Sequence, residues 1–117
     1  MLIQLKRAYE EADPGDGKRI LVERLWPRGL KKENAKIDQW LKDVAPSTEL
    51  RKWYSHDPAK WAEFKKRYWK ELELKNDTLS SLCEENKEKK VTFIFSSKEE
   101  KLNNAAALKE YIETMLK

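Results

Sequence analysis

Residues 91–95 read VTFIF, and this stretch decides the fold class. It is short, β-branched and aromatic with charged flanks, a pattern typical of a buried strand. Two further strands are predicted at 2–7 (LIQLKR), where apolar and polar residues alternate, and at 19–25 (RILVERL), which contains an Ile-Leu-Val run. The turn sequence DPGDG at 13–17 separates these two. The sequence therefore predicts a small sheet of about three strands.

The remaining segments predict helices. Ile37, Trp40, Leu41 and Val44 follow helical spacing, which predicts a helix over about 33–43 that ends before Pro46. The other expected helix starts are Ser47 or Thr48, Asp57 followed by Pro58 (a helix running to about 75), Asp77 or Thr78, and a capping box at Ser97-Lys98-Glu99-Glu100.

These elements predict a compact α/β domain with a parallel or mixed sheet covered on both faces by about five helices. A hairpin between the first two strands is the alternative, because their connection of about ten residues is short for a crossover.

Composition predicts one soluble domain spanning residues 1–117. One Cys and one His exclude a Cys-rich metal site and a His pair, so neither metal nor cofactor is expected. Three Gly exclude a GxGxxG loop. No apolar run approaches the roughly 18 residues of a membrane span, and the N-terminus lacks the features of a signal peptide. We therefore expect a cytoplasmic protein that does not interact with a membrane.

The net charge is +4, with acidic and basic residues interspersed along the chain. Only six of the 25 basic residues are Arg, and four of these six fall within residues 1–28. Because the planar guanidinium suits bidentate pairing, this placement favours buried ion pairs or an anion site near Arg24 and Arg28.

Polar residues follow two predicted strands, where α/β sheets bind ligands. Arg24 and Arg28 lie near the carboxyl end of the second strand, whereas Ser96 and Ser97 follow the third. The residues expected to bind a ligand are Arg24, Trp26, Arg28, Arg51, Ser96, Ser97, Asn103 and Asn104. His56 and Asp43 are the candidate acid–base residues, because His normally titrates near neutral pH.

Three segments resemble the YeaO-like branch of the DUF488 family, bacterial proteins of unknown function. They are VERLWPRGL at 22–30, WLKDVAPSTELRKWYSHDPAKWAEFKKRY at 40–68 and NNAAALKEYI at 103–112, and the resemblance covers nearly the whole chain in the same order. It implies a small α/β domain and brings no established reaction or cofactor. Its pattern marks Arg24, Trp26, Pro27, Arg28, Gly29, Lys42, Asp43, Pro46, Ser47, Arg51, His56, Asp57, Asn103, Asn104 and Ala105.

The chain departs from that family pattern at two positions. Glu23 stands where the family usually has Asp, and Leu102 stands where it usually has His. A mechanism that uses two His residues is therefore not expected here.

Three functions remain open from the sequence. The first is binding of a small phosphate- or carboxylate-bearing ligand in an Arg-rich cleft at the strand ends, with or without acid–base catalysis. The second is a structural or protein-interaction domain with an internal Arg–carboxylate–Asn network. The third is a nucleic-acid-binding module that uses the basic helix face at 65–70 together with the five Trp residues. Nothing in the sequence indicates the oligomeric state.

Overall fold

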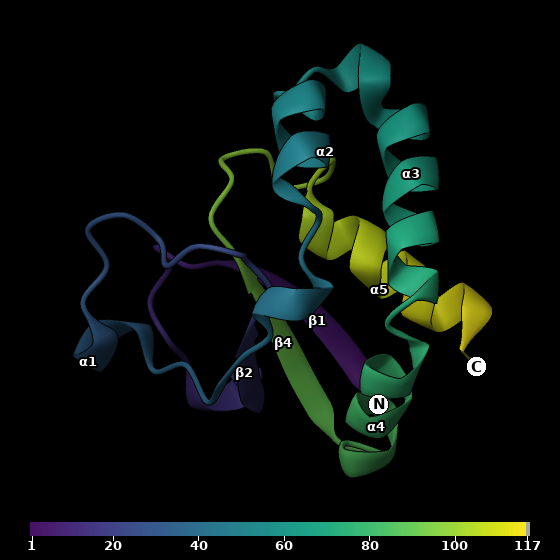
Figure 1. Cartoon of the computed structure of the whole chain (residues 1–117). Coiled ribbons are helices and arrows are strands. Elements are labelled where there is room, and N and C mark those ends of the chain that lie inside the picture. The colour runs from purple at the N-terminus through teal and green to yellow at the C-terminus, as the bar shows by residue number, and fades with distance from the viewer. Residues whose placement is uncertain (117) are drawn as a thin grey trace.

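The computed structural model describes residues 1–116, and the strands in this part of the chain form one sheet. Its order is β1-β4-β2-β3, and every neighbouring pair is parallel. The strands are β1 (Leu2–Arg7), β2 (Lys18–Leu21), β3 (Gln39–Trp40) and β4 (Lys90–Phe95). The three predicted strands are confirmed, although β2 ends at Leu21 rather than at 25. The alternative hairpin is not formed, since β4 lies between β1 and β2 (Figure 1).

β4 occupies an interior position of the sheet because most of its side chains are apolar and both of its faces are buried. Val91, Phe93 and Phe95 join the main core on one face, and Ile94 joins a smaller cluster on the other. A strand buried on both faces reads as a continuous apolar run in a parallel sheet. The VTFIF stretch therefore fixes both the strand and its place in the sheet.

The prediction of a helix over 33–43 is wrong. Only α1 (Lys32–Ala35) is helical, and the chain leaves it at Lys36 in a left-handed conformation with φ of 48°. A contact with a residue distant in sequence stabilises a non-helical backbone instead: Asp38 Oδ2 accepts a hydrogen bond from the Arg19 N–H (2.8 Å). Residues 39–40 then pair with β2 as the additional strand β3. The apolar residues at helical spacing are divided between both faces of the sheet instead of lining one helix face.

The other predicted helices are present, but three starts differ. The helices are α2 (Thr48–Tyr54), α3 (Trp61–Glu73), α4 (Asn76–Glu85) and α5 (Asn104–Met115), and short 3-10 turns occupy Pro14–Asp16, Lys42–Val44 and Pro58–Lys60. Ser47 caps α2 as predicted. α4 begins at Asn76 rather than at Asp77 or Thr78, and Asp57 caps a 3-10 turn that leads into α3; the third difference is the start of α5. The capping box at 97–100 does not start α5; Asn103 does, because its Oδ1 accepts the Ala106 N–H at 2.9 Å. The Ser97 hydroxyl instead accepts the Glu99 N–H within a loop.

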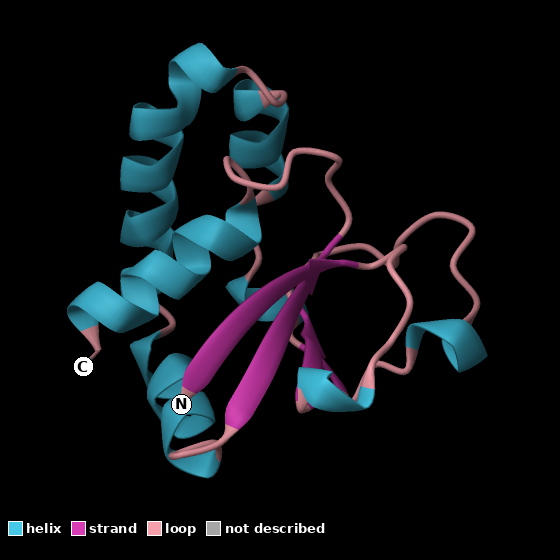
Figure 2. Ribbon diagram, turned by 180° about the vertical axis from the view of Figure 1, so that it is seen from behind, coloured by secondary structure: helices cyan, strands magenta, loops and turns pink. Residues whose placement is uncertain are grey.

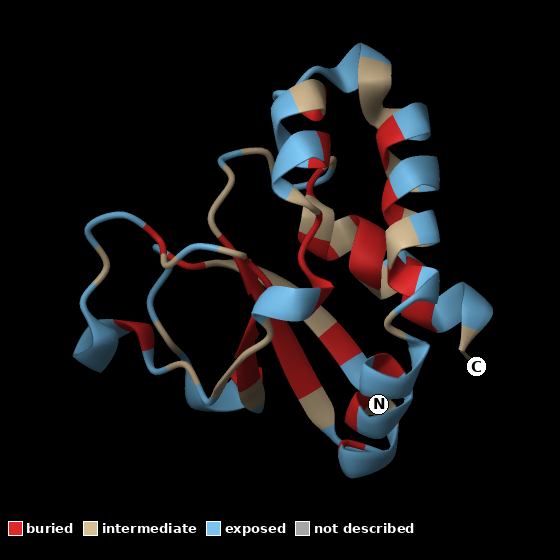
Figure 3. Cartoon of the chain, in the orientation of Figure 1, coloured by how far each residue is buried: buried red, intermediate tan, exposed pale blue. Residues whose placement is uncertain are grey.

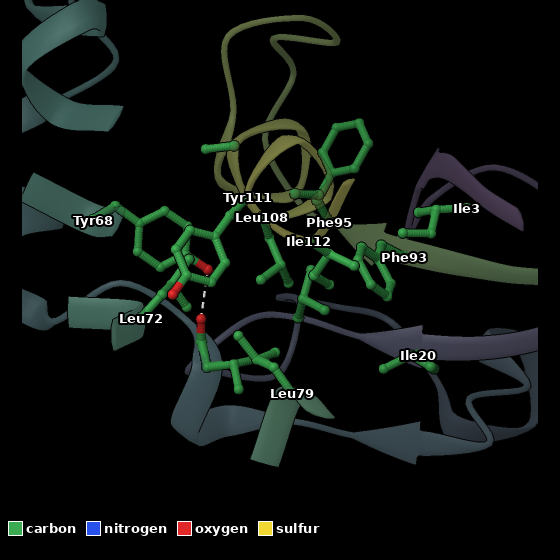
Figure 4. Close-up of a cluster of buried hydrophobic side chains, with 14 of the residues drawn as sticks. Ile3, Ile20, Tyr68, Leu72, Leu79, Phe93, Phe95, Leu108, Tyr111 and Ile112 are labelled. Atoms are coloured by element: carbon green, nitrogen blue, oxygen red, sulfur yellow. Dashed lines mark hydrogen bonds between the residues drawn. The ribbon is translucent and has the colours of Figure 1, made fainter. Parts of the chain in front are cut away.

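Most of the helices lie on one face of the sheet. α2, α3, α4 and α5 cover that face, whereas α1 and its flanking loops lie beyond the opposite face (Figures 1 and 2). Buried positions concentrate in β4 and on the inward sides of α3 and α5 (Figure 3). Figure 4 shows the side chains of Phe93, Leu108 and Ile112 grouped where α5 packs on the sheet. The helices thereby leave the carboxyl ends of β2 and β4 facing α2 and the start of α5.

Candidate functional site

A cleft of about 590 Å³ opens beyond the carboxyl ends of β2 and β4. Four segments that are distant in sequence meet there: Glu23 beyond the end of β2, the α2 region, Phe64 of α3, and the segment from the end of β4 into α5. The lining residues are Glu23, Pro46, Arg51, Tyr54, His56, Phe64, Ser96, Ser97, Lys98, Glu99, Asn103 and Asn104. The cleft therefore lies where the topology of a parallel sheet places ligand sites.

Six of the ten predicted site residues line this one cleft: Arg51, His56, Ser96, Ser97, Asn103 and Asn104. The other four, Arg24, Trp26, Arg28 and Asp43, are not among its lining residues. The predicted ligand site is thus divided between the cleft and positions elsewhere on the fold.

Arg24 has a structural role. Its Nε donates to the Pro46 carbonyl (3.0 Å), and Nη2 donates to the Ala45 carbonyl (2.8 Å). Both carbonyls belong to buried residues, so the guanidinium satisfies acceptors that water does not readily reach. The Arg24 guanidinium therefore pairs with backbone carbonyls rather than with a carboxylate. These hydrogen bonds anchor the loop before α2 to the chain just beyond β2.

Trp26, Arg28 and Asp43 also have surroundings other than the cleft. Trp26 packs edge-on against Trp40 with ring centroids 5.5 Å apart, and its Nε1 donates to the Leu30 carbonyl. Arg28 is exposed, and its carbonyl accepts the Tyr9 hydroxyl. Asp43 is exposed in a 3-10 turn. The acid–base pair of His56 with Asp43 is consequently not assembled in the cleft.

Six lining residues were not predicted as site residues from the sequence: Glu23, Pro46, Tyr54, Phe64, Lys98 and Glu99. Glu23 is the most deeply placed ionisable group among them. It is only 5% exposed, and its Oε2 accepts the Ser96 N–H at 3.1 Å. Burial raises its pKa, and hydrogen bonds from Ser96 and Asn104 together with the charge of Arg51 offset only part of that effect. The available signal was its position near the carboxyl end of a buried strand, which it shares with Arg24.

The two Asn residues brace the cleft. Asn103 donates to the Glu99 carbonyl while it caps α5, and Asn104 Nδ2 donates to the Val22 carbonyl at 2.8 Å. These bonds tie the start of α5 to the end of β2 and to the loop after β4. Both side chains line the cleft, yet the amide group of each is already hydrogen-bonded to the backbone of the protein.

His56 reaches the cleft through an unusual backbone. Ser55 and His56 both have left-handed φ values, of 46° and 56°, although neither is Gly. Such conformations are costly for residues with a Cβ and cluster at functional sites. They bring the imidazole to within 6.3 Å of the Tyr54 ring, measured between centroids, while His56 stays exposed.

The positive and negative side chains of the cleft lie at different depths. Arg51 and Lys98 are exposed, and within residues 1–116 neither side chain has a hydrogen bond or ion pair to the protein. Glu23 lies deep, whereas the Glu99 carboxylate accepts the N–H groups of Lys101 and Leu102, which lowers its pKa. The free positive groups therefore face solvent, and the free acidic group faces inward.

The basic face of α3 is partly neutralised by the chain itself. A shallower hollow of about 370 Å³ includes Lys65, Lys66, Trp69 and Lys70. Lys65 pairs with Glu110 at 3.1 Å, however, and the adjacent Arg67 pairs with Glu63 at 2.8 Å. These pairs reduce the positive charge that the face offers to a phosphate backbone.

The described residues form neither a metal-binding cluster nor a membrane-spanning helix. Among residues 1–116, no group of three or more His, Cys, Asp or Glu side chains is arranged to hold a metal ion. Over the same residues, every helix is too short or too polar to cross a bilayer.

Comparisons with known proteins identify relatives without an assigned activity. The model of a family described as "Inactive DUF488-N3 subclade" matches residues 2–117. The uncharacterized protein YeaO of Escherichia coli (strain K12) is 38% identical over 98% of this chain and 100% of its own length. The uncharacterized protein Rv3073c of Mycobacterium tuberculosis (strain ATCC 25618 / H37Rv) is 50% identical over 60% of this chain, and the match spans 59% of its length. No solved structure matches.

Proposed function

The chain belongs to the DUF488 family, and from that premise we propose that it binds a small ligand bearing a carboxylate or phosphate group in the strand-end cleft. One observation carries the proposal: Arg51 lines the cleft with no protein acceptor for its guanidinium in the described chain. Arg forms bidentate hydrogen bonds with carboxylate and phosphate groups. Lys98 and His56 line the same cleft and add a second cation and a titratable donor.

The proposed role is binding without turnover. The description of the matching subclade as inactive supports it. The exposed position of Asp43 outside the cleft lining supports it too, because an acid–base pair must reach the same substrate. A protein of this kind would sense or sequester its ligand.

A thermal-shift experiment tests the proposal. The probes are inorganic phosphate, phosphate monoesters, simple mono- and dicarboxylates and L-amino acids, which also carry a carboxylate, applied to the wild type and to Arg51→Ala. A ligand at 100 times its Kd adds about 2.7 kcal/mol, which raises the Tm of a domain of this size by about 10 °C. We expect at least one probe to shift the wild type, and Arg51→Ala to lose the shift while its Tm without ligand changes little.

Arg28→Ala is the matched control, because Arg28 is also an exposed arginine but lies outside the cleft lining. It should keep the full ligand-induced shift. A flat response of the wild type to every probe, or a shift of equal size in Arg51→Ala, refutes the proposed anion site.

A further inference from the structure

The cleft holds a buried negative group opposite a free positive one. Glu23 is 5% exposed, and the hydrogen bond at its Oε2 comes from the Ser96 backbone. Arg51 lies on the exposed side of α2 and lines the same cleft. The charge of Arg51 acts on Glu23, so the two groups are within electrostatic range of each other.

Glu23 and Arg51 do not neutralise each other by contact. The ion pairs in residues 1–116 are Lys6–Asp16, Arg19–Asp16, Lys65–Glu110 and Arg67–Glu63. The Glu23 and Arg51 side chains both line the cleft, and they form no ion pair with each other among these residues. Burying a carboxylate without a cationic partner is unfavourable, and a ligand can supply the missing partner.

We propose that the cleft takes a zwitterion of the amino-acid class, with its ammonium group on the Glu23 carboxylate and its carboxylate group on Arg51. The inference rests on the proposed function, since it uses the same anion site. A ligand that carried only negative charge would meet the Glu23 carboxylate as a like charge in a poorly hydrated position. An ammonium group removes that repulsion and adds a charge-assisted hydrogen bond.

The aromatic wall of the cleft indicates the kind of side chain that fits. The rings of Tyr54 and Phe64 stack with centroids 4.3 Å apart and an interplanar angle of 25°, and both residues line the cleft. The Tyr54 hydroxyl is already committed to the Leu102 carbonyl at 2.8 Å. The wall therefore offers apolar surface, which favours an amino acid with an aliphatic or aromatic side chain.

The experiment compares ligands that differ only in the amino group. Each apolar and aromatic L-amino acid is titrated calorimetrically against its deamino carboxylate, for example L-phenylalanine against 3-phenylpropionate. We expect at least one amino acid to bind the wild type about tenfold or more tightly than its deamino partner. Glu23→Gln should bring that ratio close to one, because it weakens binding of the amino acid and relieves the repulsion of the deamino carboxylate, and Arg51→Ala should weaken both ligands.

The outcomes separate the two proposals. If deamino carboxylates bind as tightly as the amino acids and depend on Arg51, the zwitterion inference is overturned and the anion site stands. If neither class nor inorganic phosphate binds, both are overturned. The comparison of ligands on the wild type is informative even if Glu23→Gln does not fold. Glu23→Asp is the second variant, and it should keep a preference for the amino group because it keeps the charge.

Discussion

The structural role of Arg24 gives a sharp prediction. In Arg24→Ala, the carbonyls of Ala45 and Pro46 lose their guanidinium donors. A buried acceptor left without a partner costs about 1–3 kcal/mol, so two together predict a loss of about 3 kcal/mol of unfolding free energy. For a chain of 117 residues the unfolding entropy is about 0.25 kcal/mol/K, so the Tm should fall by about 12 °C.

Urea unfolding followed by tryptophan fluorescence measures the free energy, and calorimetry measures the Tm. Arg28→Ala is the matched control and should stay within about 0.5 kcal/mol of the wild type, because the Arg28 side chain is exposed. Ligand binding by folded Arg24→Ala should be retained, because Arg24 does not line the cleft. If Arg24→Ala lost ligand binding while its free energy of unfolding stayed unchanged, Arg24 would be a ligand-binding residue and its structural role would be contradicted.

Two further predictions concern Gly17 and Glu23. Gly17→Ala should lose more than about 2 kcal/mol, because φ is +65° and a Cβ would collide with the Lys90 carbonyl; Gly29→Ala, at φ +76° in open space, should lose only about 1 kcal/mol by the same urea assay. The raised pKa of Glu23 means that the folded state holds this proton more tightly than the unfolded state, so its contribution to stability is present below the ordinary glutamate pKa and is lost as pH rises through the raised value. Urea unfolding between about pH 4 and pH 8 should therefore show a decline in the wild type that Glu23→Gln lacks; parallel pH profiles for the two proteins would contradict the assignment.

The strands could be predicted because their signals are local. Four of residues 91–95 are apolar and the fifth is the β-branched Thr92, a composition typical of a strand buried on both faces of a parallel sheet. The segment 33–43 could not be predicted in the same way. Its helical spacing is real, but the Arg19 N–H binds Asp38 and the Trp40 Nε1 binds the Glu23 carbonyl, and both partners lie on or next to β2. The spacing of apolar residues along the chain gives no information about interactions between segments that are distant in sequence.

The start of α5 illustrates competition between two local signals. Ser97 and Glu100 have capping-box spacing, yet Asn103 is the residue that caps the helix. The Glu99 carboxylate accepts the N–H groups of Lys101 and Leu102 and so stabilises the loop as a non-helical segment. Side chains of this type favour turns as readily as caps, and tertiary packing of 103–104 on the end of β2 decides between them.

The location of the candidate site was more predictable than its individual residues. Strand-end topology alone brought Ser96, Asn103 and Asn104 to one cleft, because the carboxyl ends of parallel strands share an edge. The concentration of Arg near the N-terminus was a weaker guide. A guanidinium binds carbonyls as well as it binds ligands, and Arg24 reaches the carbonyls of Ala45 and Pro46 only in the folded chain.

Position within the fold also explains why Glu23 and Arg51 are better placed for a ligand than Arg24. A group at the end of a buried strand must either find a partner inside the protein or remain costly, and Arg24 finds two carbonyls. Glu23 keeps an ionisable group that burial disfavours, beside a cleft that its neighbours leave open. Arg51 lies on the exposed side of α2, where solvent or a ligand can supply a hydrogen-bond acceptor. A fold that tolerates a costly carboxylate and an unpaired guanidinium around one cleft gains nothing in stability from either, and a bound zwitterion would satisfy both.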